Sequence, residues 1–567
     1  MRNYQNTEVV HSEVTDNETS VLNGKSTSNL PQCSWMPNVA IESISFSTAF
    51  PKNVLTIPEV QQNKLKKANE KRDIKEAKSR RESASSDTDN EQDEECLYYL
   101  DLYSKSTEAW MSSSSSHKWA HNTCPDADGE DDELCVNSVS LRIMAVSENL
   151  LNPVIRKRLE VIMYKRNVKD VEISITPATI ENPNMLGLIW ELRITGKDAG
   201  NSGIVEFNWI LKSATLNEVV RKYAQIDRLF KKEIYVYDKI LPVYQELIEQ
   251  HNIQEFFAVT PEMHLYFTDT FQESLILENL KKPNYGFVSV KSSESCSHSQ
   301  VILAMKALGK LHALSYALHE HKPEEFKKFS EFARNRFNVN VNIELYAKHQ
   351  KLCCERVLEA LNCGKDKSMV PLFKKFMEKP FEYQMQAVKM GAMGPYAVLT
   401  HGDAILDNML FKYGDSNHPD MPTEICLLDW QFCRLGSPAL DLSQFLFIST
   451  NKEFRDKYYT EMIRTYYYSL CTYLAELKCD ADKILPFDIL QLQLKRYAVY
   501  GLSMAVMTLH IIMNDTPNNH NWKGNVKASD IEATFAGTVT NNVESYKTRI
   551  RDIVLDFKDY GYFEFLN

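Results

Sequence analysis

The sequence has few of the features that mark several large classes of protein. Only 12 of its 567 residues are cysteine and no Cys-x-x-Cys pair occurs, which argues against a disulfide scaffold, a zinc ribbon and a thioredoxin-like motif. The 18 glycines and 20 prolines exclude a fibrous chain. The N-terminal stretch lacks the apolar segment of a secretory signal, and no uninterrupted apolar run reaches about 18 residues. We therefore expect a cytoplasmic protein without a membrane span.

An excess of positive charge is also missing. The chain has 65 lysine and arginine residues against 76 aspartate and glutamate residues, a formal net charge of −11. Such a chain has no general attraction for phosphate backbones, so we expect no nucleic-acid partner. With 43% hydrophobic residues it is long enough for a globular protein with two lobes and an additional tail.

The first part of the chain differs in composition from the rest. A basic run at 64–82 is followed by acidic runs at 87–95 and 126–133. Blocks of like charge bury too little apolar surface to offset chain entropy, so residues 1–139 are predicted to be a disordered, charged tail. The basic-then-acidic order leaves a nuclear or regulatory segment as an alternative to a solvated linker.

Residues 140–280 are predicted to form a small lobe built on a sheet. Its expected strands cover 170–178, 186–195, 204–213, 264–268 and 275–277, with a helical stretch from Thr215 that we expect Pro242 to interrupt. In the third strand Val205, Phe207, Trp209 and Leu211 alternate with other residues. This period of two places Lys212 on the opposite face of the strand.

Residues 281–567 are predicted to form a larger, mostly helical lobe. The expected helices cover 300–319, 324–362, 454–478 and 487–513, and a hairpin pairs 409–413 with 425–429. A sheet followed by helices is an α+β arrangement with two lobes. The cleft between the lobes is where a ligand is expected to bind.

Three polar side chains are expected to meet at the base of the hairpin. Asn408 follows Asp403 by five residues, and Asp429 stands at the end of the second strand. Convergent oxygen ligands of this kind suit Mg²⁺, which completes its coordination with phosphate oxygens and water. Phosphoryl transfer also needs a cation for the nucleotide phosphates, which Lys212 can supply with Glu233 as its ion-pair partner.

These residues resemble a known group of enzymes. The His-Gly-Asp at 401–403, the asparagine five residues later and the Asp-Trp-Gln at 429–431 resemble the aminoglycoside phosphotransferase and choline kinase branch of the protein-kinase-like fold. Longer segments, including FNWILKSAT at 207–215 and DWQFCRLGSPALDL at 429–442, are similar to the ecdysteroid kinase-like family. This similarity covers roughly residues 140–567 in order and implies a bilobal protein-kinase-like fold.

The resemblance implies a role for each polar residue of the site. Asp403 would be the catalytic base or orient the accepting hydroxyl group. Asn408 and Asp429 would hold Mg²⁺. Lys212 would contact the α- and β-phosphates of ATP, with Glu233 behind it.

The resemblance also implies residues that bind the base and support the catalytic loop. Glu278, Asn279 and Leu280 would form the hinge that meets adenine through backbone groups. Asp441 would hold the loop by hydrogen bonds to its backbone, and His401 is interpreted as a buried histidine of the same loop.

The sequence departs from the family pattern at two places. The turn expected to cover the nucleotide, 179–188, contains only Gly187, so the stretch from Asn182 to Leu188 lacks a pair of phosphate-approaching glycines. Ile405 stands where the family usually has tryptophan, which suggests a different acceptor. Elsewhere, Cys353 and Cys354 are interpreted as ordinary helix residues and not as metal ligands.

The sequence therefore predicts an ATP- and Mg²⁺-dependent kinase that phosphorylates a hydroxyl group of a small lipophilic molecule. By resemblance, the acceptor would be an ecdysteroid or a related steroid or xenobiotic. Only 11 residues separate Asp429 from Asp441, which leaves little chain for the peptide-docking segment of a protein kinase. Two alternatives stay open, namely an inactive kinase-like protein that binds nucleotide or steroid, and an interaction protein that acts through its tail.

Overall fold

The computed structural model describes the chain from the end of the charged region onward. The described residues are 153–178, 187–200, 203–294, 296–335, 343–361, 364–414, 418–513 and 542–566. All of them belong to one compact unit, Asp132–Asn567. The predicted tail at 1–139 and most of the nucleotide-covering turn lie outside the described residues.

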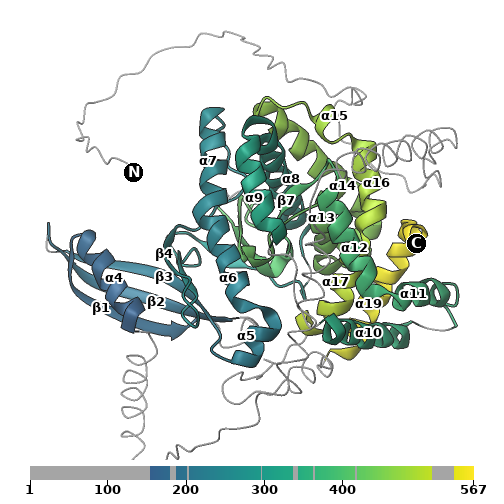
Figure 1. The fold of residues 1–567 in the computed structure, drawn as a ribbon, viewed down its shortest axis with the longest axis horizontal. Coiled ribbons are helices and arrows are strands. Elements are labelled where there is room, and N and C mark those ends of the chain that lie inside the picture. Colours follow the sequence, from purple (N-terminus) through teal and green to yellow (C-terminus); the bar gives the residue numbers. More distant parts are fainter. Residues whose placement is uncertain are drawn as a thin grey trace, which may run out of the picture. The chain divides into compact units, whose positions relative to one another are not determined.

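The first part of this unit is a five-stranded antiparallel sheet (Figure 1). Its strands are β1 (Val168–Pro177), β2 (Gly187–Asp198), β3 (Ile204–Ala214), β4 (Met263–Phe267) and β5 (Ser274–Glu278), in the order β1-β2-β3-β5-β4. These bounds confirm the five predicted strands to within a few residues.

One face of the sheet is covered by a helix that the sequence reading did not identify. Helix α4 (Pro153–Lys165) buries Leu159 and Met163 in one apolar cluster with Trp209 and Leu211 of β3. The strict alternation along β3 therefore puts these two residues into the core under α4. Lys212 is turned to the other face, as predicted.

A helical segment follows strand β3, with the left-handed residue Gln225 between its first two helices. It consists of α5 (Glu218–Ala224), α6 (Ile226–Tyr235), a π-helical turn (Val236–Ile240) and α7 (Leu241–Gln250). The prediction that Pro242 interrupts the helix is wrong. The helix continues past this residue to Gln250, with Pro242 in the first turn of α7 directly after the π-helical turn.

The rest of the unit is helical with two small sheets, which confirms the α+β class. The longer helices are α8 (His298–His321), α9 (Pro323–Asn335), α10 (Ile343–Ala360), α11 (Met369–Glu378), α12 (Pro380–Met393), α13 (Pro438–Ser449), α14 (Lys452–Glu476), α16 (Phe487–Tyr497), α17 (Val499–Ile512) and α19 (Val543–Asp559), with the short α15 (Ala481–Ile484). The strands are β6 (Phe287–Ser289), β8 (Met409–Lys412) and β9 (Glu424–Leu427) in one sheet, and β7 (Val398–Thr400) with β10 (Arg434–Gly436) in the other.

Two of the predicted long helices are each two helices. The helix expected at 324–362 is divided into α9 and α10, and the one expected at 487–513 is divided into α16 and α17. At the second division the backbone of Ala498 has a ψ of −16°, a tightened turn that ends the regular α-helix. The break lets the almost wholly apolar α17 pack against α12 and α13 while α16 keeps a polar face.

Helix α8 is the one helix in the described part of the chain that is long and apolar enough to cross a membrane. In the structure 78% of its most apolar window is buried, and it packs lengthwise against α14. These contacts are those of a core helix.

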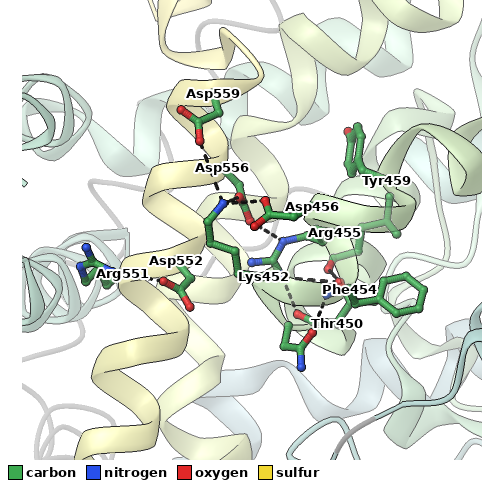
Figure 2. A network of polar contacts seen from close by, with 12 residues as sticks. Thr450, Lys452, Phe454, Arg455, Asp456, Tyr459, Arg551, Asp552, Asp556 and Asp559 are labelled. Atoms are coloured by element: carbon green, nitrogen blue, oxygen red, sulfur yellow. Dashed lines mark hydrogen bonds and ion pairs between the residues drawn. The ribbon is translucent and has the colours of Figure 1, made fainter. Parts of the chain in front are cut away.

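A buried ion-pair network attaches the C-terminal helix α19 to α14 (Figure 2). Asp556 of α19 accepts a hydrogen bond from Arg455 Nε at 2.6 Å and another from Lys452 Nζ at 2.6 Å. Arg455 and Asp556 are 1% exposed, so neither charge has water as an alternative partner.

We expect Asp556→Ala to lower the free energy of unfolding by about 3–5 kcal/mol, because it leaves the Arg455 charge buried without its carboxylate. Chemical denaturation of the two proteins measures this difference. Asp559→Ala is the matched control, because Asp559 is 61% exposed and 4.0 Å from Lys452. A loss of stability no larger than that of the control would contradict this role for Asp556.

Candidate active site

The hairpin β8–β9 brings the two halves of the predicted site together. Its strands pair in an antiparallel register with Met409 opposite Leu427. Just outside this pair, the Leu428 amide donates a hydrogen bond to the Asn408 carbonyl at 2.9 Å. Asn408 and Asp429 are therefore held beside each other at the same end of the hairpin, as the sequence predicts.

The loop that carries Asp403 depends on a glycine. Gly402 has a φ of +84°, in the left-handed region, and a Cβ atom there would lie 1.9 Å from the carbonyl oxygen of Phe432. No other residue fits this close approach without a shift of the backbone. The Gly402 carbonyl faces Tyr500 and Arg434, whose side chains donate to it at 3.3 and 3.4 Å.

A buried carboxylate fixes the same loop from below. Asp441, in the first turn of α13, accepts hydrogen bonds from the amides of His401 at 2.7 Å and Gly402 at 2.9 Å. His312 Nε2 lies 3.1 Å from the same carboxylate. Burial opposes the ionised form, but the hydrogen bond and charge of His312 lower the pKa of Asp441 below its ordinary value. Asp441 thus makes the hydrogen bonds to the loop backbone that the resemblance implies.

His401 lies under the loop, where its Nδ1 accepts a hydrogen bond from the Asp403 amide at 3.4 Å. Its ring is fully buried, and the centroids of the His401 and Trp430 rings lie 4.5 Å apart. Burial lowers the pKa of His401, so the side chain is neutral. Its burial and its contact with the loop backbone are observed, and its supporting role stays a prediction.

The carboxylate of Asp403 is held by two amides. Asn408 Nδ2 donates to Asp403 Oδ2 at 2.9 Å, and Gln444 Nε2 donates to Asp403 Oδ1 at 2.7 Å. Burial, followed by the negative charge of Asp429, raises the pKa of Asp403 to about 7. A carboxylate with this pKa is well suited to exchange a proton with a substrate near neutral pH.

Lys212 joins the sheet to the hairpin. Its Nζ lies 2.6 Å from Glu233 Oε2 and 2.7 Å from Asp429 Oδ1, a contact across 217 positions of sequence. Burial lowers the pKa of Lys212, but the charges of Asp429 and Glu233 outweigh it and the net shift is upward. Burial, with a contribution from Asp429, raises the pKa of Glu233 to about 7.

Asp429 occupies a backbone conformation that few residues adopt. Its φ of 66° and ψ of 58° are left-handed, which is uncommon for a residue other than glycine. One carboxylate oxygen faces Lys212 and the other accepts a hydrogen bond from Gln431 Nε2 at 3.2 Å. Such conformations concentrate at functional sites, where the surrounding structure holds them.

The donor set fits a magnesium ion. Asn408 uses its amide nitrogen toward Asp403, which leaves its Oδ1 as the ligand atom. A carboxylate oxygen has more than one lone pair, so the contacts of Asp429 leave acceptor capacity for a cation. One carboxylate and one amide oxygen are the hard ligands that Mg²⁺ takes when phosphates and water supply the rest.

Several groups of the predicted hinge already make hydrogen bonds within the protein. The Asn279 amide donates to the Asn208 carbonyl at 3.1 Å, and the Leu280 carbonyl accepts from the Phe287 amide at 3.2 Å. The side chain of Glu278 accepts a hydrogen bond from Tyr285. Fewer hinge groups are thus left for adenine than the resemblance implies, and the contact with the base stays a prediction.

The single glycine near the predicted nucleotide-covering turn has a packing role. A Cβ atom at Gly187 would lie 2.8 Å from the Ser213 carbonyl oxygen and 3.3 Å from the Phe230 ring. Gly187 therefore permits the close approach of β2, β3 and α6, which places Lys212 near Glu233. The remainder of the turn lies outside the described residues.

The sequence reading missed several residues that support the site. Gln444 orients Asp403, Gln431 contacts Asp429, and His312 contacts Asp441. A signal for the first of these existed, because Asp441 and Gln444 are one helical turn apart in α13, whose other residues are mostly apolar. Two buried polar residues on one side of such a helix indicate a polar site beside it.

Comparisons with known proteins found one family and several solved structures. The sequence pattern of the ecdysteroid kinase-like family matches residues 181–479, a range that includes Lys212, Asp403 and Asp429. Among solved structures, aminoglycoside 2'-phosphotransferase-IIIa in complex with GDP is 10% identical, with a TM-score of 0.30 over 63% of this chain and 90% of that one. Glucosamine kinase is 8% identical, with a TM-score of 0.30 over 72% of this chain and 84% of that one. No curated protein sequence matches the chain.

Proposed function

The chain belongs to the ecdysteroid kinase-like family, and from this premise we propose that it transfers the γ-phosphoryl group of ATP to a hydroxyl group of a small lipophilic molecule. Mg²⁺ is the proposed metal. The family name supports an ecdysteroid, or a related steroid or xenobiotic, as the acceptor. A cytoplasmic location is part of the same proposal.

One observation carries the proposal, which is the meeting of Lys212, Asp429, Asn408 and Asp403 from two parts of the chain. Lys212 reaches Asp429 at 2.7 Å, and Asn408 reaches Asp403 at 2.9 Å. Phosphoryl transfer depends mainly on positioning and on charges that stabilise the transferred group, and these side chains are of the required types.

Each residue has a task that follows from its surroundings. Lys212 would bind phosphate oxygens, with Glu233 keeping its ammonium group in place. Asn408 and Asp429 would hold the metal, which supplies positive charge to the phosphates. Asp403, oriented by Gln444, would accept the proton of the attacking hydroxyl group.

Incubation of the full-length protein with labelled ATP, Mg²⁺ and a panel of steroids, phenols and amino-alcohols tests the proposal directly. Transfer of label to a steroid or another lipophilic alcohol is the expected result. Transfer only to amino-alcohols would keep the kinase activity and overturn the lipophilic acceptor. A wild-type protein that binds MgATP and phosphorylates nothing would favour the alternative, an inactive kinase-like binder of nucleotide or steroid.

We expect Lys212→Ala to lower turnover by about 10²–10³-fold, because it removes a positive charge that stabilises the phosphates in a buried site. Stability should fall much less, because Glu233, whose pKa is about 7, can become neutral by taking a proton when its partner is lost.

Steady-state kinetics and thermal unfolding of the same preparation measure the two effects. Lys197→Ala in the neighbouring strand β2 is the control, because the Lys197 side chain is 62% exposed and pairs only with Asp170 among the ion pairs of the described residues. Turnover equal to wild type in Lys212→Ala would remove Lys212 from the proposed active site.

A further inference from the structure

A second group of polar side chains lies in the helical part, where α10, α17 and α19 pack on one another (Figure 1). Two of its members, His349 and Cys353, stand one turn apart on the same side of α10. The third, His510, comes from the last turn of α17. All three are buried, and their nitrogen and sulfur atoms lie within 4.8 Å of one another.

The spacing of one pair in this group is that of two ligands around one metal ion. Cys353 Sγ is 3.4 Å from His349 Nε2. In a tetrahedral zinc site with Zn–S of about 2.3 Å and Zn–N of about 2.0–2.1 Å, a sulfur and a nitrogen ligand are about 3.6 Å apart. A thiol–imidazole hydrogen bond alone would also explain this pair, but it leaves the third member unexplained.

His510 is that third member, and its ring has no polar partner among the described residues. The side chain is 1% exposed, and neither Nδ1 nor Nε2 makes a hydrogen bond there. Burying an imidazole in this way costs free energy unless something binds it. A metal ion bound to one nitrogen would remove the cost for that atom.

The second shell of the group also contains polar atoms that no described residue satisfies. The hydroxyl group of Tyr546 on α19 is buried without a hydrogen bond, and its ring is 6.4 Å from that of His510 between centroids. Metal-bound imidazoles commonly use their other nitrogen in a hydrogen bond to a second-shell group.

We propose that His349, Cys353 and His510 bind one Zn²⁺ ion. Sulfur and imidazole ligands are those that zinc prefers. The Cys353 thiol loses its proton to solvent as the S–Zn bond forms, and the thiolate charge offsets part of the charge of the ion. The earlier interpretation of Cys353 as an ordinary helix residue would then be wrong, whereas Cys354 keeps it.

The site would have a structural task that links it to the catalytic loop. His510 is near the end of α17, and Tyr500, near the start of the same helix, donates a hydrogen bond to the Gly402 carbonyl at 3.3 Å. Zinc would fix one end of α17 to α10 while the other end supports the loop that carries Asp403. The metal proposal itself does not depend on the proposed kinase activity.

Elemental analysis of the full-length protein, purified without a metal-affinity tag, tests the proposal. We expect about one zinc ion per chain, and replacement by Co²⁺ should produce a thiolate-to-cobalt absorption band. Cys353→Ser should lose the band and most of the zinc. Cys354→Ser, the neighbouring buried cysteine of the same helix, should keep both.

A folded wild-type protein that contains no zinc and produces no thiolate band with Co²⁺ would overturn the site. So would a Cys353→Ser variant with full zinc content. If the serine variant does not fold, His510→Gln provides the second measurement, because it removes a ligand from another helix. Retention of zinc and of the band in that variant would exclude His510.

Discussion

Asp403→Asn is expected to reduce turnover by about two to four orders of magnitude, the range typical for loss of a general base, while MgATP affinity stays within a few-fold of wild type. Asparagine keeps the size of the side chain but cannot accept the proton of the substrate hydroxyl. Asp429 and Asn408 are unchanged, so binding of the metal and nucleotide should persist. Calorimetry and a transfer assay on one preparation measure the two quantities.

Asp407→Asn is the matched control for this variant. Asp407 is a second carboxylate of the same loop, and its Oδ2 accepts a hydrogen bond from the Ser292 amide at 3.0 Å. Asparagine can still accept that bond, so turnover should stay near the wild-type value. If Asp403→Asn and the control have equal turnover, Asp403 is not the base.

The pH dependence follows from the same residue. The pKa of Asp403 is raised to about 7, so kcat/KM of the wild type should increase as the pH rises through 7. Stability should change in the opposite direction. A carboxyl group whose pKa is raised by folding stabilises the fold below its unfolded pKa, and this contribution is lost as the pH rises through the folded pKa. Asp403→Asn should therefore be more stable than wild type above pH 7, as urea denaturation can measure.

Asp429→Asn is expected to abolish Mg²⁺-dependent nucleotide binding and to leave the fold intact. The substitution removes the carboxylate charge that would hold the metal. It should not disturb the backbone, because asparagine tolerates the left-handed conformation that Asp429 adopts, with a φ of 66°. Titration with ATP in the presence and absence of Mg²⁺, together with a circular dichroism spectrum, tests both parts.

The chain offers a close control for this variant. Asp170 also has a positive φ, 51°, but lies on strand β1 and pairs with Lys197. Asp170→Asn should bind MgATP like wild type. Unchanged MgATP affinity in a folded Asp429→Asn protein would show that the metal is held elsewhere.

The site was predictable from sequence where short-range patterns determine it. The alternation along β3 determines the sheet face on which Lys212 lies, and the hairpin places Asn408 beside Asp429. Both features depend only on neighbours within one or two strands. The residues that hold the site rigid were missed. His312 and Gln444 reach it from α8 and α13, and which helix faces meet is decided by packing over long sequence distances.

The same reasoning explains the errors at Pro242 and in the helical part. A proline predicts a helix break from local sterics alone, whereas the helix continues past Pro242 directly after a π-helical turn. The group of His349, Cys353 and His510 shows why a site built from distant parts of the chain is not predicted from sequence. His349 is one turn away and visible in the sequence, but His510 is 157 positions from Cys353 and only the fold brings it there.

In the proposed kinase, the contact between Lys212 and Asp429 would couple the binding of the metal to that of the nucleotide. A free Mg²⁺ ion must compete with the Lys212 ammonium group for a carboxylate that is already engaged at 2.7 Å. The phosphates of bound ATP would offer the ammonium group another anionic partner and would thereby release Asp429 for the metal. By thermodynamic reciprocity the metal in turn favours the nucleotide. Metal and nucleotide would thus bind cooperatively, and in the absence of ATP the Lys212 ammonium group would oppose the binding of divalent cations to Asp429.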